Sequence, residues 1–86
     1  MLDQKRLEAI TSEVAKILRR EREKMGLSMN TVAERAGLSQ PMISLVEREL
    51  RKPTLDTLLR IGCALEIDLA EVLQEAQRAV RPRGGN

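Results

Sequence analysis

Apolar residues recur at steps of three and four along most of the chain, which is the spacing of one face of an α-helix. A helix is predicted from about Asp3 or Gln4 to Met25, with Asp3 as its N-cap and Gly26 as the residue that ends it. Thr11–Ser12 is a rival start, which would separate a short leading helix from the main one. The apolar positions behind this prediction are Leu7, Ile10, Val14, Ile17, Leu18 and Met25.

Two short helical patterns follow, on either side of a tight turn at Gly37–Leu38–Ser39. The first is predicted over Met29–Ala36 and the second over Gln40 to about Glu47–Glu49. Ser28 and Ser39 stand directly before them and are typical N-caps. This layout is typical of a helix-turn-helix, whose second helix reads base edges in the DNA major groove. The inward residues are predicted to be Val32, Ala33, Ala36, Ile43 and Val46, with Met42 or Leu50 at the edges.

The remaining pattern predicts two more helices. One spans Leu55–Leu65 after the N-cap Thr54, and the other spans about Leu69–Val80 after Asp68. Glu71 stands three residues after Asp68, as in a capping box. Nothing in the chain resembles a strand, so the pattern predicts an all-α domain of five helices. The inward residues of the fourth helix are predicted to be Leu55, Leu58, Leu59, Ile61, Gly62 and Leu65.

Length and apolar runs limit the class of protein. The chain has 86 residues, which is the length of one domain. Its longest apolar run is far below the roughly 20 residues of a membrane span, and the charges of Glu8 and Glu13 break any signal-peptide core. We therefore expect a cytoplasmic protein without membrane contact. The single cysteine, Cys63, is predicted to be a small buried hydrophobe, and Arg81–Asn86 a frayed basic tail.

Several residue types are absent from the composition. The chain has no histidine and no Phe, Tyr or Trp. Without histidine the usual parts of acid–base and metal sites are missing, so we expect no enzyme, no metal and no cofactor. Acidic pairs such as Glu21 and Glu23 are better explained as solvated helix charges. The lack of aromatic side chains argues against proteins that stack single-stranded bases.

The net charge is +2, and the isoelectric point is near 9.1. This mild excess decides little by itself, because a protein that reads a DNA groove needs only a local positive patch.

From about Leu18 to Leu73 the chain resembles the Cro/CI-type helix-turn-helix domain of phage repressors and many bacterial regulators. The matching segments are RREREKMGLS, TVAERAGLSQPMISLVE and RKPTLDTLLRIGCALEIDL, at the family's spacing. The resemblance implies a compact, five-helix, lambda-repressor-like fold, with the helix-turn-helix at about residues 29–48. Residues 1–17 are then an N-terminal extension and the start of the first helix, 18–73 the domain, and 74–86 the end of the last helix and the tail.

The start of the second short helix carries the candidate base-reading residues. Gln40 is able to offer a bidentate amide to adenine, and Ser44 lies one turn later on the same face. Pro41 and Leu45 flank that face, where they can touch a thymine methyl group but cannot hydrogen-bond a base through their side chains. The plainer interpretation is that Gln40 and Ser44 are ordinary solvated helix residues. The operator sequence stays undetermined.

A basic cluster follows this helix at Arg48, Arg51 and Lys52. The resemblance implies that these residues contact DNA phosphates, which gives affinity without reading sequence. An ordinary solvated charge run is the alternative. Ser28 and Ser39 are caps first, and the free N–H groups of their helices are also able to bind phosphate.

The resemblance also bears on residues outside the base-reading and basic groups. Arg22 and Glu47 match a pair that forms a buried structural salt bridge in the family. Met29 stands where relatives often carry a glutamine that touches phosphate. Glu49 replaces a helix-ending glycine, so the turn there is expected to differ. Gly62 lies within a helix, where close packing against another helix would compensate for its low helix propensity.

We therefore expect a sequence-specific regulator of transcription that binds double-stranded DNA as a homodimer, with about Gln40–Glu49 in the major groove. Phage repressors, restriction–modification controllers and antitoxins share this build. The alternative is a protein-interaction module or antitoxin-type partner-binding protein on the same fold, suggested by the apolar Met29, Met42 and Leu45. The candidate dimer surfaces are the N-terminal extension Met1–Ile10 and the last helix, at Leu69, Val72, Leu73, Ala76 and Val80.

Overall fold

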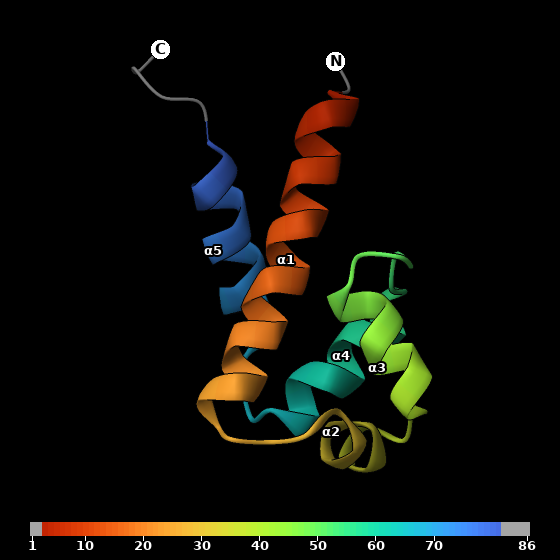
Figure 1. Ribbon diagram of the computed structural model, residues 1–86. Helices are drawn as coiled ribbons and strands as arrows, with labels where there is room; N and C mark the ends of the chain where they lie inside the picture. The colour runs from red at the N-terminus through yellow and green to blue at the C-terminus, as the bar shows by residue number, and fades with distance from the viewer. Residues whose placement is uncertain (1–2, 82–86) are drawn as a thin grey trace.

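The computed structural model describes residues 3–81, which form five α-helices (Figure 1). Each begins directly after its predicted N-cap, whose side chain accepts a hydrogen bond from a first-turn backbone N–H. The all-α prediction is therefore confirmed. The helices are α1 (Gln4–Lys24), α2 (Met29–Ala36), α3 (Gln40–Glu47), α4 (Leu55–Ala64) and α5 (Leu69–Val80).

The helix α1 runs without a break, so the rival start at Thr11–Ser12 is wrong. The Thr11 hydroxyl donates to the carbonyl of Leu7 at 2.9 Å, which leaves the helix intact. Met1, Leu2 and most of the predicted basic tail, residues 82–86, lie outside the described residues. Within residues 3–81, no helix combines the length and apolar composition that crossing a bilayer requires.

The helices form two groups around one core (Figure 1). The helices α1 and α5 lie side by side, while α2, α3 and α4 pack together beside the C-terminal half of α1. The first turns of α1 extend beyond α3 and α4, and the molecule measures 43 × 21 × 18 Å. The largest fully buried side chains are Leu18, Val32, Ile43, Val46 and Leu65.

The inward face of α4 was predicted correctly at Ile61, Gly62 and Leu65 but wrongly at Leu55 and Leu59. Leu55 and Leu59 are 63% and 53% exposed, and Cys63 is exposed rather than buried. Successive side chains of this stripe are four residues apart, so all three lie on one outward face. Besides Ile61 and Gly62, the core receives Thr57 and Ala64, which were not predicted to face inward. Of the two residues predicted at the edge of the core beside α3, Leu50 is 62% exposed, and on α1 the apolar Leu7 and Met25 are 44% and 41% exposed.

Four helices end with the same pair of backbone hydrogen bonds, the Schellman arrangement. Gly26 and Gly37 supply the left-handed residue after α1 and α2, both with φ of +70°. Glu49 and Glu66 supply it after α3 and α4, with φ of +61° and +58°. The turn after α3 therefore keeps the shape that a glycine would give it, and the expected difference at Glu49 is wrong.

Two further predictions, the capping box at Asp68 and the close packing at Gly62, concern the connection from α4 into α5. The Asp68 side chain accepts from the backbone N–H of Ala70 at 2.9 Å, but no return hydrogen bond from the Glu71 side chain is found within residues 3–81. A β-carbon on Gly62 would lie 3.5 Å from the carbonyl oxygen of Ile67 and 3.9 Å from the β-carbon of Leu69. These are ordinary contacts, so the site does not require glycine.

Candidate nucleic-acid interface

The helix α3 presents one side to the core and the other to the outside. Ile43 and Val46 are each 1% exposed and fix the inner side. Because α-helical residues repeat about every four positions on one face, the opposite side combines exposed and half-buried residues. These are Gln40, Pro41, Ser44, Leu45 and Arg48.

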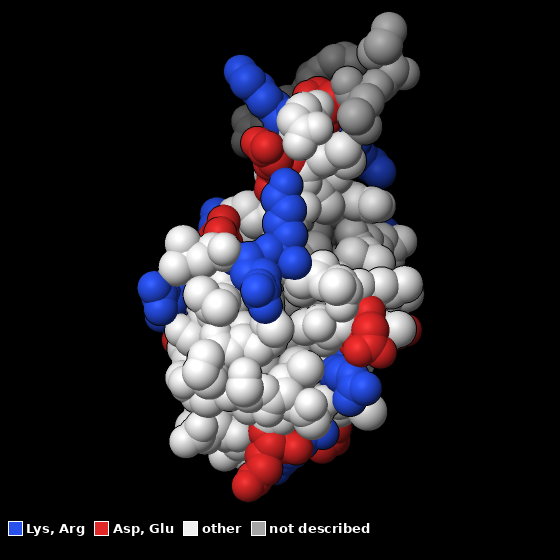
Figure 2. Space-filling view, turned by 90° about the vertical axis from the view of Figure 1, so that its right-hand side faces the viewer, with Lys and Arg blue, Asp and Glu red and all other residues white. Residues whose placement is uncertain are grey.

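Figure 2 shows the molecule from the side that carries α3. A broad surface without charge occupies this view, and Lys and Arg side chains gather above it. Acidic side chains lie mainly toward the edges of the view. A helix that meets bases rather than phosphates needs such a neutral surface, with positive charge beside it.

The cations at the end of α3 and directly after it, Arg48, Arg51 and Lys52, form no ion pair in the described part of the chain. Arg48 donates to the Ser44 hydroxyl at 3.3 Å, and Arg51 lies 3.8 Å from the sulfur of Met42. Some cationic side chains elsewhere are paired with carboxylates, namely Lys16, Arg19, Arg20, Arg22 and Arg60, whereas others, such as Lys24, Arg35 and Arg78, are not. The charges of Arg48, Arg51 and Lys52 are therefore left available for an external anion.

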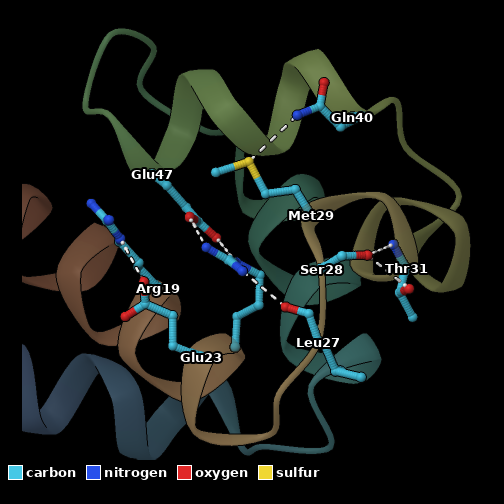
Figure 3. Close-up of polar contacts among 9 residues, drawn as sticks. Arg19, Glu23, Leu27, Ser28, Met29, Thr31, Gln40 and Glu47 are labelled. Carbon is cyan, nitrogen blue, oxygen red and sulfur yellow. Dashed lines mark hydrogen bonds and ion pairs between the residues drawn. The ribbon is translucent and has the colours of Figure 1, made fainter.

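Gln40 has a partner that the sequence did not predict. Its amide nitrogen Nε2 lies 3.5 Å from the sulfur of Met29, and Figure 3 shows the amide oxygen directed away from that sulfur. Each residue is the first of its helix, so the turn between α2 and α3 brings the two helix starts together. The sequence pattern locates both starts, but it carries no signal for this contact.

Both serines act as helix caps. Ser28 accepts from the Thr31 backbone N–H at 3.1 Å and shares a 2.9 Å hydrogen bond with the Thr31 hydroxyl (Figure 3). Ser39 accepts from the Met42 backbone N–H at 3.3 Å. Pro41 has no backbone N–H, so the start of α3 offers an anion one donor fewer than the start of α2.

Arg22 and Glu47 form an ion pair that joins α1 to the end of α3 (Figure 3). Their side chains are 11% and 5% exposed. The hydrogen bonds that Arg22 donates to the Glu47 carboxylate raise the pKa of Arg22 above its ordinary value. Arg22 also donates to the carbonyl of Leu27 at 2.8 Å, so it holds the segment that leads into α2 as well.

The described residues were also searched for a metal site and for a ligand cavity. In the part of the chain that the structure describes, no three Cys, Asp or Glu side chains gather as metal ligands would. A small cavity of about 190 Å³ opens between the first half of α1 and the segment after α3. Its lining includes Arg51 and Lys52, so it adjoins the basic cluster.

Solved structures share this fold. The clp gene regulator ClgR from C. glutamicum superposes with a TM-score of 0.76 at 24% identity, over 86% of this chain and 96% of that one. The restriction-modification controller protein C.AhdI from Aeromonas hydrophila gives a TM-score of 0.68 at 32% identity, over 73% of this chain and 94% of that one.

Sequence comparison agrees with the structures. An uncharacterized HTH-type transcriptional regulator of Mycobacterium tuberculosis, found in strains H37Rv and CDC 1551, is 50% identical over 56 residues. The match covers 65% of this chain and 39% of the relative, so it spans about two-fifths of that protein's length. A family model described as helix-turn-helix (HTH_3) matches residues 18–72. The chain therefore belongs to the Cro/CI-type helix-turn-helix family.

Proposed function

We propose that this cytoplasmic protein regulates transcription by binding a specific double-stranded DNA operator as a homodimer, with α3 in the major groove. The observation that carries the proposal is the outward side of α3, which is neutral from Gln40 to Leu45 and is bordered by cations without carboxylate partners. Family membership and the names of the relatives support the same function.

On this proposal, α3 supplies the contacts to bases. Gln40 reads a base edge from the first turn of the helix, and Ser44 reaches a base edge or a phosphate one turn later. Pro41 and Leu45 lie beside them and contact thymine methyl groups. With two apolar side chains among the four, part of the selectivity comes from groove shape rather than from hydrogen bonds.

The phosphate contacts surround this base-reading surface. Arg48, Arg51 and Lys52 neutralise phosphates along one strand, because their charges are not used within the described protein. Ser28 and Ser39 add contacts at the starts of α2 and α3, where unpaired N–H groups favour anions. These contacts give affinity and fix the orientation of α3, while the bases decide the site.

A dimer follows from the small footprint of one α3, and paired half-sites then lie about 34–36 Å apart or a multiple of that. The predicted surface on α5 is largely used within the protein, because Leu69, Val72 and Ala76 are buried. The exposed Leu55 and Leu59 of α4 offer a better self-complementary surface. Beside them, the Asp56–Arg60 ion pair, at 2.8 Å, gives each copy both signs of charge.

Sedimentation of single variants tests this dimer surface. Leu59→Glu is expected to weaken self-association, because it buries a charge against its symmetry mate. Leu7→Glu is the matched control on the N-terminal extension, which is the other candidate surface. A dimer that survives Leu59→Glu and is lost in Leu7→Glu would place the interface on α1.

The DNA proposal is tested by titrating the protein against sheared genomic DNA and sequencing what stays bound at physiological salt. We expect a short two-fold symmetric site, lost in the double variant Gln40→Ala with Arg51→Ala. Gln74→Ala with Arg78→Ala changes the same residue types on α5 and should leave the site enriched. No enrichment by the folded wild type would reject the proposal.

A protein partner is the second candidate function, since Met29 at the start of α2 and Leu45 on α3 are apolar and half-buried. Such a partner, of the antitoxin type, would bind largely through apolar contact. Salt separates the two candidates, because phosphate neutralisation makes DNA affinity fall steeply as salt rises. A partner whose binding is insensitive to salt, together with no enriched DNA site, would favour this candidate.

A further inference from the structure

The cavity between the first half of α1 and the segment after α3 combines an apolar lining with charges of both signs. Its volume is about 190 Å³. Val14, Ala15 and Val46 are buried and supply most of the apolar lining, together with the half-buried Pro53. The polar lining consists of exposed charged side chains and half-buried hydroxyl groups: Glu8, Thr11, Ser12, Glu49, Arg51 and Lys52.

The four charged side chains around this cavity are not paired with one another. Glu8 and Glu49 are carboxylates, Arg51 and Lys52 are cations, and none of the four belongs to an ion pair in the part of the chain that the structure describes. Glu8 accepts a 3.3 Å hydrogen bond from the neutral amide of Gln4, which leaves its charge in place. Both signs of charge are therefore available to a bound molecule.

This lining favours one class of small molecule. An anion would meet two carboxylates and a cation would meet two basic groups, whereas a zwitterion places each of its charges beside the opposite one. The buried apolar lining favours a short hydrocarbon group on the same molecule. The volume of about 190 Å³ lies below the range of about 300–1,000 Å³ for drug-sized ligands, so the molecule is small.

We propose that this cavity binds a free α-amino acid with a short apolar side chain, whose carboxylate meets Arg51 and Lys52 and whose ammonium group meets Glu8 and Glu49. The hydrocarbon side chain then lies against the buried apolar lining. Glu8 precedes residues 18–72, which the helix-turn-helix family model matches, so the site also requires the N-terminal half of α1.

Binding of the amino acid has a consequence for DNA, and this consequence rests on the proposed function. Arg51 and Lys52 are two of the proposed phosphate contacts, and they also line the cavity. A carboxylate held by these cations competes with a DNA phosphate, so the amino acid lowers the affinity for the operator. By linkage, the operator lowers the affinity for the amino acid by the same factor.

The first experiment titrates the isotope-labelled, DNA-free protein with L-alanine and L-valine in turn and follows the backbone amide signals by NMR. Signals of Ser12, Glu49 and Lys52 should shift and reach saturation. Isovalerate keeps the hydrocarbon part of valine without the ammonium group, and isobutylamine keeps it without the carboxylate. Each should bind about fivefold or more weakly than L-valine, because one charge-assisted interaction is lost. No shift with either amino acid, or isovalerate binding as tightly as L-valine, would overturn the inference.

A matched pair of variants locates the site. Glu49 and Glu66 each follow a helix and have a positive φ, and of the two only Glu49 lines the cavity. Glu49→Gln should weaken binding of the amino acid about fivefold or more, while Glu66→Gln should bind it like the wild type. Equal affinity in the two variants would contradict the assignment of the ammonium group to Glu49.

The second experiment measures the affinity for the enriched operator with and without the amino acid. At a concentration that saturates the wild type, the affinity for DNA should fall about fivefold or more. Glu66→Gln should respond in the same way, and Glu49→Gln should respond less. Unchanged DNA affinity at saturation would overturn the coupling. Failure of the proposed function is a different result, because the wild type then enriches no operator while the titration of the DNA-free protein still decides whether the cavity binds an amino acid.

Discussion

The guanidinium of Arg22 and the carboxylate of Glu47 meet side-on, with two N–O distances of 2.7 and 2.9 Å. Such a bidentate pair fixes both position and angle. Since Glu47 is the last residue of α3 and Arg22 lies near the end of α1, the pair sets where α3 stands relative to the longest helix.

Glu47→Ala is expected to lower the free energy of unfolding by about 3–5 kcal/mol, because it leaves the Arg22 charge with little solvent and no carboxylate. Urea denaturation measures the change, and DNA affinity should fall with it. Glu34→Ala is the control, since it removes an exposed glutamate from α2. An unchanged melting temperature in Glu47→Ala would show that the pair contributes nothing to stability.

Glu49→Gly and Glu66→Gly should each raise the free energy of unfolding by about 1 kcal/mol, because glycine adopts a positive φ without the steric cost of a β-carbon. Thermal denaturation checks both. The two variants should differ at DNA, because only the Glu49 turn follows α3 and adjoins the basic cluster. Tighter binding is expected for Glu49→Gly alone, and equal affinity in both variants would place Glu49 away from the phosphates.

Gly62→Ala should stabilise the protein by about 0.5–1 kcal/mol, because alanine favours a helix and loses less entropy on folding. The added methyl group meets neighbours at 3.5 Å and beyond, so nothing has to move. Gly37→Ala is the contrasting variant, since it combines a positive φ with a 3.1 Å approach to the Arg60 side chain, and it should destabilise. A loss of stability in Gly62→Ala would mean that the space around Gly62 in the α4–α5 connection is tighter than these distances indicate.

For the proposed dimer on DNA, a plot of log affinity against log salt concentration should have a slope near −5. Three cations per copy make about six phosphate contacts, and each contributes about 0.9. Arg51→Ala removes one contact per copy and should reduce the slope by about 2, whereas Arg78→Ala on α5 should not. Fluorescence anisotropy at several salt concentrations measures this, and an unchanged slope in Arg51→Ala would remove that residue from the phosphate contacts.

Acid should weaken the link between α1 and α5 that Arg20 and Glu75 form at 2.7 Å. Hydrogen bonds from Arg20 lower the pKa of Glu75 below its ordinary value. The stabilisation is therefore present above the unfolded-state pKa and is lost as pH falls through the folded-state pKa. Because both side chains are about half exposed, the effect is small. Comparing Glu75→Gln with wild type by denaturation at pH 7 and pH 3 checks it, and an equal difference at both values would contradict it.

Helix starts were predictable because Ser, Thr and Asp caps are local signals, and the structure confirms all five. The inward side of α4 was predictable only in part, since apolar residues surround that helix and periodicity alone does not select a face. Ile61 and Leu59 were both predicted to face inward, and only Ile61 is buried, because packing against α2 and α5 decides the face and that is a tertiary effect. The contact of Gln40 with Met29 was missed for the same reason, because it depends on how the turn folds back.

The neutral surface around α3 has a consequence for the search along a genome. A protein held to arbitrary DNA mainly by three cations per copy dwells briefly at each wrong position, because few counterions are displaced there. Occupancy of the operator then depends on slow dissociation, and the contacts to bases are what slow it. Changes to Gln40, Ser44 or Leu45 should therefore appear mainly in the lifetime of the complex and hardly at all in its rate of formation.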